Sequence, residues 1–92
     1  MLIAEAPIGT VVRIEGDIAS LMLRPNSAVQ ALEVELVDES GRLTVVWLGR
    51  YAIRGLTPGR RLTVEGRVVR QGDLRLMYNP RYELHPRSVD EH

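Results

Sequence analysis

The 92-residue sequence contains no cysteine, no lysine and no phenylalanine. Without cysteine, neither a disulfide framework nor a thiolate metal site can form. Without lysine, a P-loop ATPase of the Gly-x-x-x-x-Gly-Lys-Ser/Thr type is excluded. Aliphatic side chains must therefore supply most of the core. The length fits one domain, and we expect residues 1–92 to form it, with a core over about 9–84 and flexible ends at 1–8 and 85–92.

Other signals are also missing. No run approaches the roughly 18 apolar residues of a membrane span. Residues 1–6 include no basic leader, so we expect no signal peptide and a cytoplasmic location. His85 and His92 have no nearby cysteine, and the serines have no recognisable base partner. We therefore expect no metal site, no cofactor and no enzyme.

Charge is divided unequally along a chain whose formal net charge is zero. Residues 1–41 carry two Arg and seven acidic residues, a net −5, whereas residues 42–87 carry ten Arg and three acidic residues, a net +7. All twelve basic residues are Arg, which suits bidentate contact with phosphate and stacking on bases. A GC-rich genome would also produce Arg-only usage, so both interpretations stay open. The asymmetry favours one side that faces a polyanion.

Apolar and polar residues alternate with period two, which predicts β-strands. We expect five of them, around residues 9–23, 32–36, 42–47, 60–70 and 74–78. Residues 38–41 read as a tight hairpin turn in which Gly41 can adopt a positive φ. Such a turn pairs positions whose numbers sum to about 79, which places Leu36 opposite Leu43 and Val34 opposite Val45.

Gly16 and Gly66 interrupt two of the apolar strand faces. Interior glycines are typical of the bends by which a small barrel closes. Residues 50–56 do not alternate and predict a helical turn or two, with Tyr51 plugging the bottom of the barrel. The sequence thus predicts an all-β, five-stranded OB-fold barrel with a short helical link between strands 3 and 4. An SH3-like barrel is the structural alternative, and the helical link favours the OB-fold.

Several short motifs occur in a characteristic order and spacing. They are Val12-x-Ile14-x-Gly16, Leu36-Val37-Asp38-x-x-Gly41-x-Leu43, Val45-Val46-Trp47-Leu48 with Tyr51, Leu56-x-Pro58-Gly59, Val64-Glu65-Gly66, and Leu76-Met77-x-Asn79-Pro80-x-Tyr82-Glu83. Over residues 9–84 the sequence resembles the OB (wedge) domain of RecG-type DNA helicases and small stand-alone OB-fold proteins of actinobacteria. The resemblance implies binding to single-stranded or branched DNA. It does not extend to a motor or to the long aromatic-bearing insertion that separates strands.

OB-folds bind single strands across strands 2 and 3 and the flanking loops. Basic groups contact the backbone there, and aromatic side chains stack on bases. The candidate nucleic-acid-binding residues are Arg24, Arg42, Thr44, Arg70, Arg75 and Tyr78. We expect single-stranded or branched DNA as the partner, with RNA as an alternative. Scattered solubilising arginines are the competing interpretation.

Three other residues qualify this prediction. Glu33 and Glu35 project onto the same face and should repel phosphate. Trp47 falls on the inward face of its strand, so we expect it to pack in the core rather than to stack on bases.

A protein-interaction module is the second functional hypothesis. A partner or a second copy could add a strand at an exposed sheet edge. Val37, Val46 and Met77 would then form an apolar patch on the outside.

Overall fold

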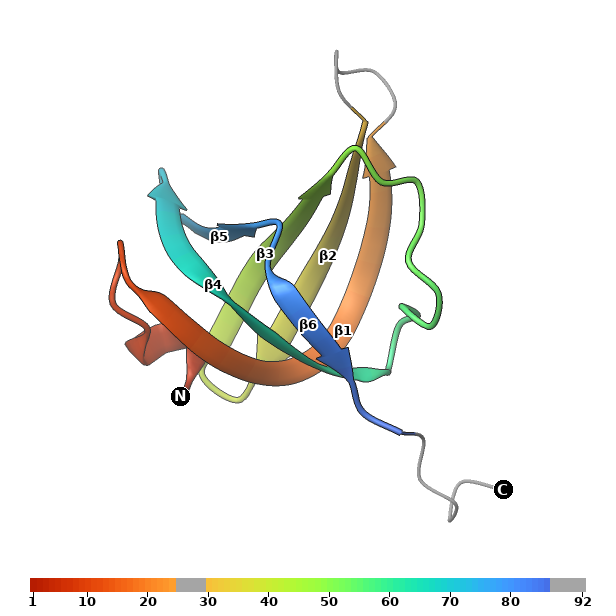
Figure 1. Ribbon diagram of the computed structural model, residues 1–92. Helices are drawn as coiled ribbons and strands as arrows, with labels where there is room; N and C mark the ends of the chain where they lie inside the picture. Colours follow the sequence, from red (N-terminus) through yellow and green to blue (C-terminus); the bar gives the residue numbers. More distant parts are fainter. Residues whose placement is uncertain (25–29, 87–92) are drawn as a thin grey trace.

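The computed structural model describes residues 1–24 and 30–86 (Figure 1). These residues form an all-β protein, as the alternation predicts. A 3₁₀ turn, η1, precedes six strands. The elements are η1 (Ile3–Glu5), β1 (Val11–Arg24), β2 (Ala31–Asp38), β3 (Gly41–Leu48), β4 (Arg61–Gln71), β5 (Leu74–Tyr78) and β6 (Arg81–Leu84).

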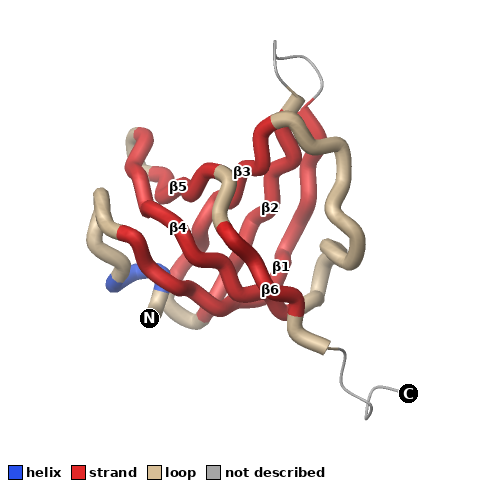
Figure 2. The backbone as a smooth tube through the Cα atoms, viewed as in Figure 1, coloured by secondary structure: helices blue, strands red, loops and turns tan. Residues whose placement is uncertain are grey.

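Five of the strands form a closed, hydrogen-bonded ring in the order β1, β2, β3, β5, β4 and back to β1. Neighbours in the ring are antiparallel except β3 and β5, which run parallel. Figure 2 shows these strands curving around a common interior. The sixth strand, β6, was not predicted. It follows the Asn79-Pro80 turn and pairs antiparallel with β4.

The β2–β3 hairpin has the predicted register, with Leu36 opposite Leu43 and Val34 opposite Val45. The predicted tight turn forms, with Asp38 paired to Gly41, but Gly41 does not use the positive φ that it could have adopted. The Asp38 carboxylate closes the turn instead. Its Oδ1 accepts hydrogen bonds from the Ser40 amide at 2.7 Å, the Ser40 hydroxyl at 2.6 Å and the Gly41 amide at 3.1 Å. A side chain that bonds the backbone two residues on makes this type of turn.

The predicted helical link between strands 3 and 4 is wrong. Residues 49–60 form turns without a helix and run along one side of the molecule (Figure 1). Gly49, Gly55 and Gly59 all have positive φ in this segment, a backbone conformation that a right-handed helix cannot contain. Tyr51 is 67% exposed and plugs nothing, whereas Ile53 is buried in the core.

The bends predicted at the two interior glycines coincide with changes of strand partner. β1 pairs with β4 over residues 11–17 and with β2 over residues 17–24, so Gly16 lies at the changeover. A Cβ on Gly16 would lie 2.6 Å from the Val37 carbonyl oxygen. Gly66 lies where β4 passes from β1 to β5. At each of these two corners, neighbouring atoms lie so close to the glycine that a side chain there would collide with them.

A β-bulge follows the first corner. Ile18 pairs with Leu36 and Ser20 pairs with Glu35, which leaves Ala19 as an additional residue in β1. One additional residue exchanges the two faces of a strand. Odd-numbered residues therefore point outward before the bulge, and even-numbered residues point outward after it.

The core lies inside the ring and is almost entirely aliphatic. It begins before the predicted start at residue 9, since Ile3 is 1% exposed and Ala6 is also buried. The Ile3 amide donates to Asp38 Oδ2 at 2.8 Å and holds the N-terminal segment against the β2–β3 turn. Residues 87–92, which make up most of the predicted C-terminal tail, lie outside the described residues. The main cluster comprises Ile3, Ala6, Val12, Ile14, Ile18, Leu32, Val34, Leu36, Leu43, Val45, Trp47, Ile53, Leu56, Leu62, Val64, Val68 and Met77.

Trp47 packs in this core as predicted. It is 4% exposed, and its Nε1 donates to the Pro80 carbonyl at 3.3 Å. The predicted outer patch of Val37, Val46 and Met77 does not form, because Met77 is fully buried inside the ring and Val46 is buried in a separate small cluster. No helix within the described ranges is long and apolar enough to cross a membrane.

Candidate nucleic-acid interface

The outer face of β2, β3 and β5 is hollowed by two adjoining depressions of about 400 and 320 Å³. Both are lined by Thr44 and Leu74, so we treat them as one surface, the strand groove. The larger depression is lined by Ser20, Met22, Arg24, Glu33, Val34, Glu35, Thr44, Gln71, Leu74 and Leu76. The smaller is lined by Ala4, Gly41, Arg42, Thr44, Asp73, Leu74 and Arg75.

Apolar side chains form part of the strand groove. Leu76 is buried against Val46 and pairs with Thr44 on one side and Val69 on the other. Met22 and Leu74 are each 52% exposed where β1 and β5 border the groove. The groove therefore offers apolar contact area between polar side chains, an arrangement suited to a ligand with flat apolar faces and a charged backbone.

The two acidic residues expected to oppose binding are each paired with a candidate arginine. Arg24 Nε lies 2.6 Å from Glu33 Oε2, and Arg42 Nη1 lies 3.4 Å from Glu35 Oε1. The arginine side chains are more than half exposed, and the glutamates about a quarter to a third. The guanidinium groups thus lie outermost. Each also keeps N–H donors beyond those in the ion pair.

The other candidates make local contacts. Arg70 Nε donates to the Gly72 carbonyl at 2.9 Å in the β4–β5 turn. The Arg75 guanidinium donates to the Ile3 carbonyl and thereby ties η1 to β5. Tyr78 is 46% exposed at the end of β5, where it pairs with Val46.

The structure therefore brings four of the six predicted site residues together along the strand groove. These are Arg24, Arg42, Thr44 and Arg75. Arg70 and Tyr78 lie beside it. The loop predicted to flank the site after Arg24 falls on residues 25–29, outside the described residues.

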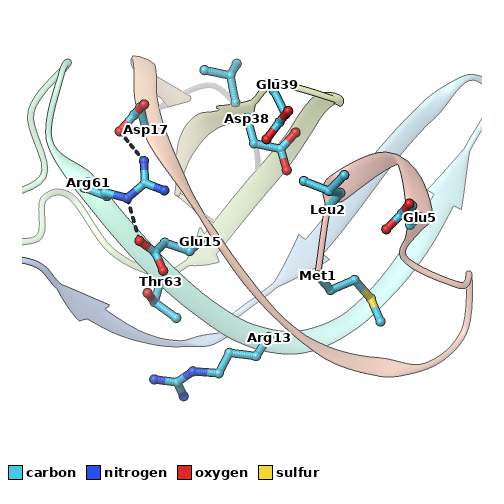
Figure 3. Close-up of a pocket in the computed structure, with 11 residues that line it drawn as sticks. Met1, Leu2, Glu5, Arg13, Glu15, Asp17, Asp38, Glu39, Arg61 and Thr63 are labelled. Carbon is cyan, nitrogen blue, oxygen red and sulfur yellow. Dashed lines mark hydrogen bonds and ion pairs between the residues drawn. The ribbon is translucent and has the colours of Figure 1, made fainter.

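A second surface, which the sequence did not predict, is a hollow of about 740 Å³ between the first half of β1 and the N-terminal segment (Figure 3). We call it the acidic groove, because five carboxylates and two arginines line it. The lining residues are Met1, Leu2, Glu5, Arg13, Glu15, Asp17, Val37, Asp38, Glu39, Arg61 and Thr63. The outward alternation of Arg13, Glu15 and Asp17 is the one signal that could have indicated it.

Arg61 lies between two carboxylates in the acidic groove, as Figure 3 shows. Its Nε is 2.5 Å from Glu15 Oε2, and its Nη1 is 3.1 Å from Asp17 Oδ1. The hydrogen bond from Arg61 lowers the pKa of Glu15. Burial raises the pKa of Asp38, but the hydrogen bonds that close the β2–β3 turn outweigh this effect, so the net pKa is lowered. The lowered pKa of Glu15 and of Asp38 favours the ionised, negative form of both carboxyl groups.

Within residues 1–24 and 30–86, no group of three or more His, Asp or Glu side chains could hold a metal ion. No protein-family model matches the chain, and no match is found among curated proteins or solved structures.

Proposed function

We propose that the chain is an OB-fold module that binds single-stranded or branched nucleic acid along the strand groove, without motor activity. The carrying observation is the position of the groove. It crosses β2 and β3, the face by which OB-folds bind oligonucleotides, and three arginines line it. The ring order with its parallel β3–β5 pair supports the OB-fold assignment, as does the resemblance to the OB domain of RecG-type helicases. Such a ligand fits a cytoplasmic location.

The polar and the apolar side chains of the groove contact different parts of the ligand in this proposal. Arg24 and Arg42 lie outermost and contact phosphates, while the partly exposed Met22 and Leu74 contact base faces. Each phosphate competes with a glutamate that already holds the arginine. We therefore expect modest affinity, with a Kd of about 1–100 μM that rises with salt as condensed counterions are released. No ordered base sequence is required for such contacts.

The experiment is fluorescence anisotropy with labelled single-stranded and forked DNA and with RNA, at about 50 mM salt. We expect R24Q/R42Q to bind about tenfold more weakly than wild type, because the change removes two phosphate contacts and leaves two glutamates unpaired. The matched variant R13Q/R61Q makes the same change of charge at the acidic groove and should bind nearly as wild type. Absence of binding by the wild-type protein at about 50 μM would refute the proposal.

A second candidate function is strand addition by a protein partner or another copy. Residues 20–24 of β1 pair with β2, whereas the pairing of β1 with β4 ends at Asp17. Met22 and Leu23 are 52% and 43% exposed on this stretch, and such an edge can accept a further strand. Size-exclusion chromatography with light scattering tests self-association. A strict monomer at all concentrations would reject the version with a second copy.

A further inference from the structure

Two carboxylates lie within the proposed nucleic-acid interface, where simple phosphate binding would disfavour them. Glu33 and Glu35 project from β2 on the same face and line the strand groove. Each is neutralised by an arginine through one carboxylate oxygen, Oε2 of Glu33 and Oε1 of Glu35. The ion pairs therefore reduce the repulsion between these carboxylates and a bound phosphate. The carboxylates can then interact with other groups of the ligand.

The ion pairs leave each carboxylate able to accept further hydrogen bonds. An ionised carboxylate has two oxygens and about four acceptor positions, of which the arginine contact uses one or two. The side chains are 25% and 33% exposed, so they are accessible from the groove. Residues two apart on a strand are separated by about 7 Å, which places two acceptors in a row on a surface that also exposes Met22 and Leu74.

We propose that Glu33 and Glu35 accept hydrogen bonds from the exocyclic amino groups of bases in the strand groove. Cytosine, adenine and guanine carry such a group, and a carboxylate accepting from the cytosine amino group is an established mode of base recognition. Thymine and uracil present a carbonyl oxygen at the corresponding position, which the carboxylate repels. The interface thus disfavours thymine and uracil without reading an ordered sequence.

Arg24 and Arg42 act as positioning residues in this scheme. Each fixes one carboxylate oxygen of its glutamate, while its remaining donors are free for the phosphates,. The inference rests on the proposed function, because the bases reach the glutamates only if the strand lies in this groove.

The test compares oligo(dC) and oligo(dT) of about 15 nucleotides, at pH 8, where cytosine is unprotonated. Wild-type protein should bind oligo(dC) about five- to tenfold more tightly than oligo(dT). In E33Q/E35Q this ratio should fall towards one, because an amide offers both a donor and an acceptor. Affinity for oligo(dT) should rise at the same time, because two negative charges are lost.

The matched control is E5Q/E39Q, which makes the same change of charge at exposed residues of the acidic groove. It should keep the wild-type ratio. Equal wild-type affinity for both oligonucleotides, or an unchanged ratio in E33Q/E35Q, would overturn base selection while leaving the proposed function intact. Binding only after the glutamates are replaced would show that they suppress binding rather than select bases. If neither protein bound either oligonucleotide, the proposed function would fail and the inference with it.

Discussion

The strand groove and the acidic groove both use β1, and both place arginine beside carboxylate, but their charge balances differ. Five carboxylates share two arginines in the acidic groove, where Arg61 is held by two of them. Three arginines meet three carboxylates in the strand groove. Nearby carboxylates offset the positive charge of an arginine and weaken its attraction for phosphate. The number of arginines alone therefore does not identify a polyanion-binding face.

The bulge at Ala19 separates the two surfaces. Before it, β1 presents Glu15 and Asp17 to the acidic groove, and after it the same strand presents Met22 and Arg24 to the strand groove. One strand thereby serves two surfaces of different charge, because the bulge exchanges its faces.

The largest expected effect on stability comes from the corner at Gly16, in the strand β1 that both grooves use. Gly16→Ala places a Cβ 2.6 Å from a backbone oxygen that cannot easily move, and should lower the free energy of unfolding by about 2–3 kcal/mol. Gly66→Ala is the matched control, since its Cβ meets the flexible Met77 side chain at 3.0 Å and should cost about 1 kcal/mol or less. Urea unfolding measures both. Equal losses would contradict a special role for the first corner.

The second largest effect should be a loss of stability caused by a substitution in the acidic groove. Asp38→Ala removes the acceptor for Ile3, Ser40 and Gly41 and should destabilise the protein by about 1–2 kcal/mol, with little change in DNA binding. The Asp38 pKa is lower in the folded protein. Its contribution is therefore present above the unfolded pKa of about 3.9 and is lost as pH falls through the folded pKa.

Thermal unfolding of wild type and Asp38→Ala between pH 7 and pH 2 measures this difference. It should stay constant down to about pH 4 and shrink below that value. A difference that grew on acidification would contradict the assigned role.

The smallest effect should be a change in DNA affinity caused by a substitution at the edge of the strand groove. If Tyr78 stacks on a base, Tyr78→Ala should weaken DNA binding about fivefold, at the lower end for one stacking contact. Tyr51→Ala is the matched control, because Tyr51 is also exposed but lies in the β3–β4 connection. Anisotropy titrations compare the two. Similar losses in both variants would remove Tyr78 from the interface.

Much of the fold could be predicted because its determinants are local. The inward alternation and the hairpin register follow from strand periodicity and from one two-residue turn,. The link after β3 was mistaken for a helix because residues 50–56 lack alternation, whereas the decisive feature is positive φ at three glycines. The strand β6 was missed because it is only four residues long and depends on pairing with β4.

The candidate site was only partly predictable. Outward positions on adjacent strands placed Arg42 and Thr44 correctly beside the groove. The ion pairs of Arg24 with Glu33 and of Arg42 with Glu35 depend on side-chain contacts and alter the expected repulsion. Folding also brings the charges of the two chain halves together, because β1 pairs with β4, which carries three arginines, and β2 pairs with β3, which carries Arg42.

The sequence by itself determined the all-β class, the inward faces of β2, β3 and β4 and the need for bends at Gly16 and Gly66, because these follow from period-two alternation and from the absence of a side chain. It did not determine the inward face of β5, where Met77 points into the core. Only the tertiary structure decided which strands close the ring, where Ala19 exchanges the faces of β1, and which carboxylate each arginine meets. These features depend on contacts between residues far apart in the chain, and alternation within a strand carries no information about its distant neighbours.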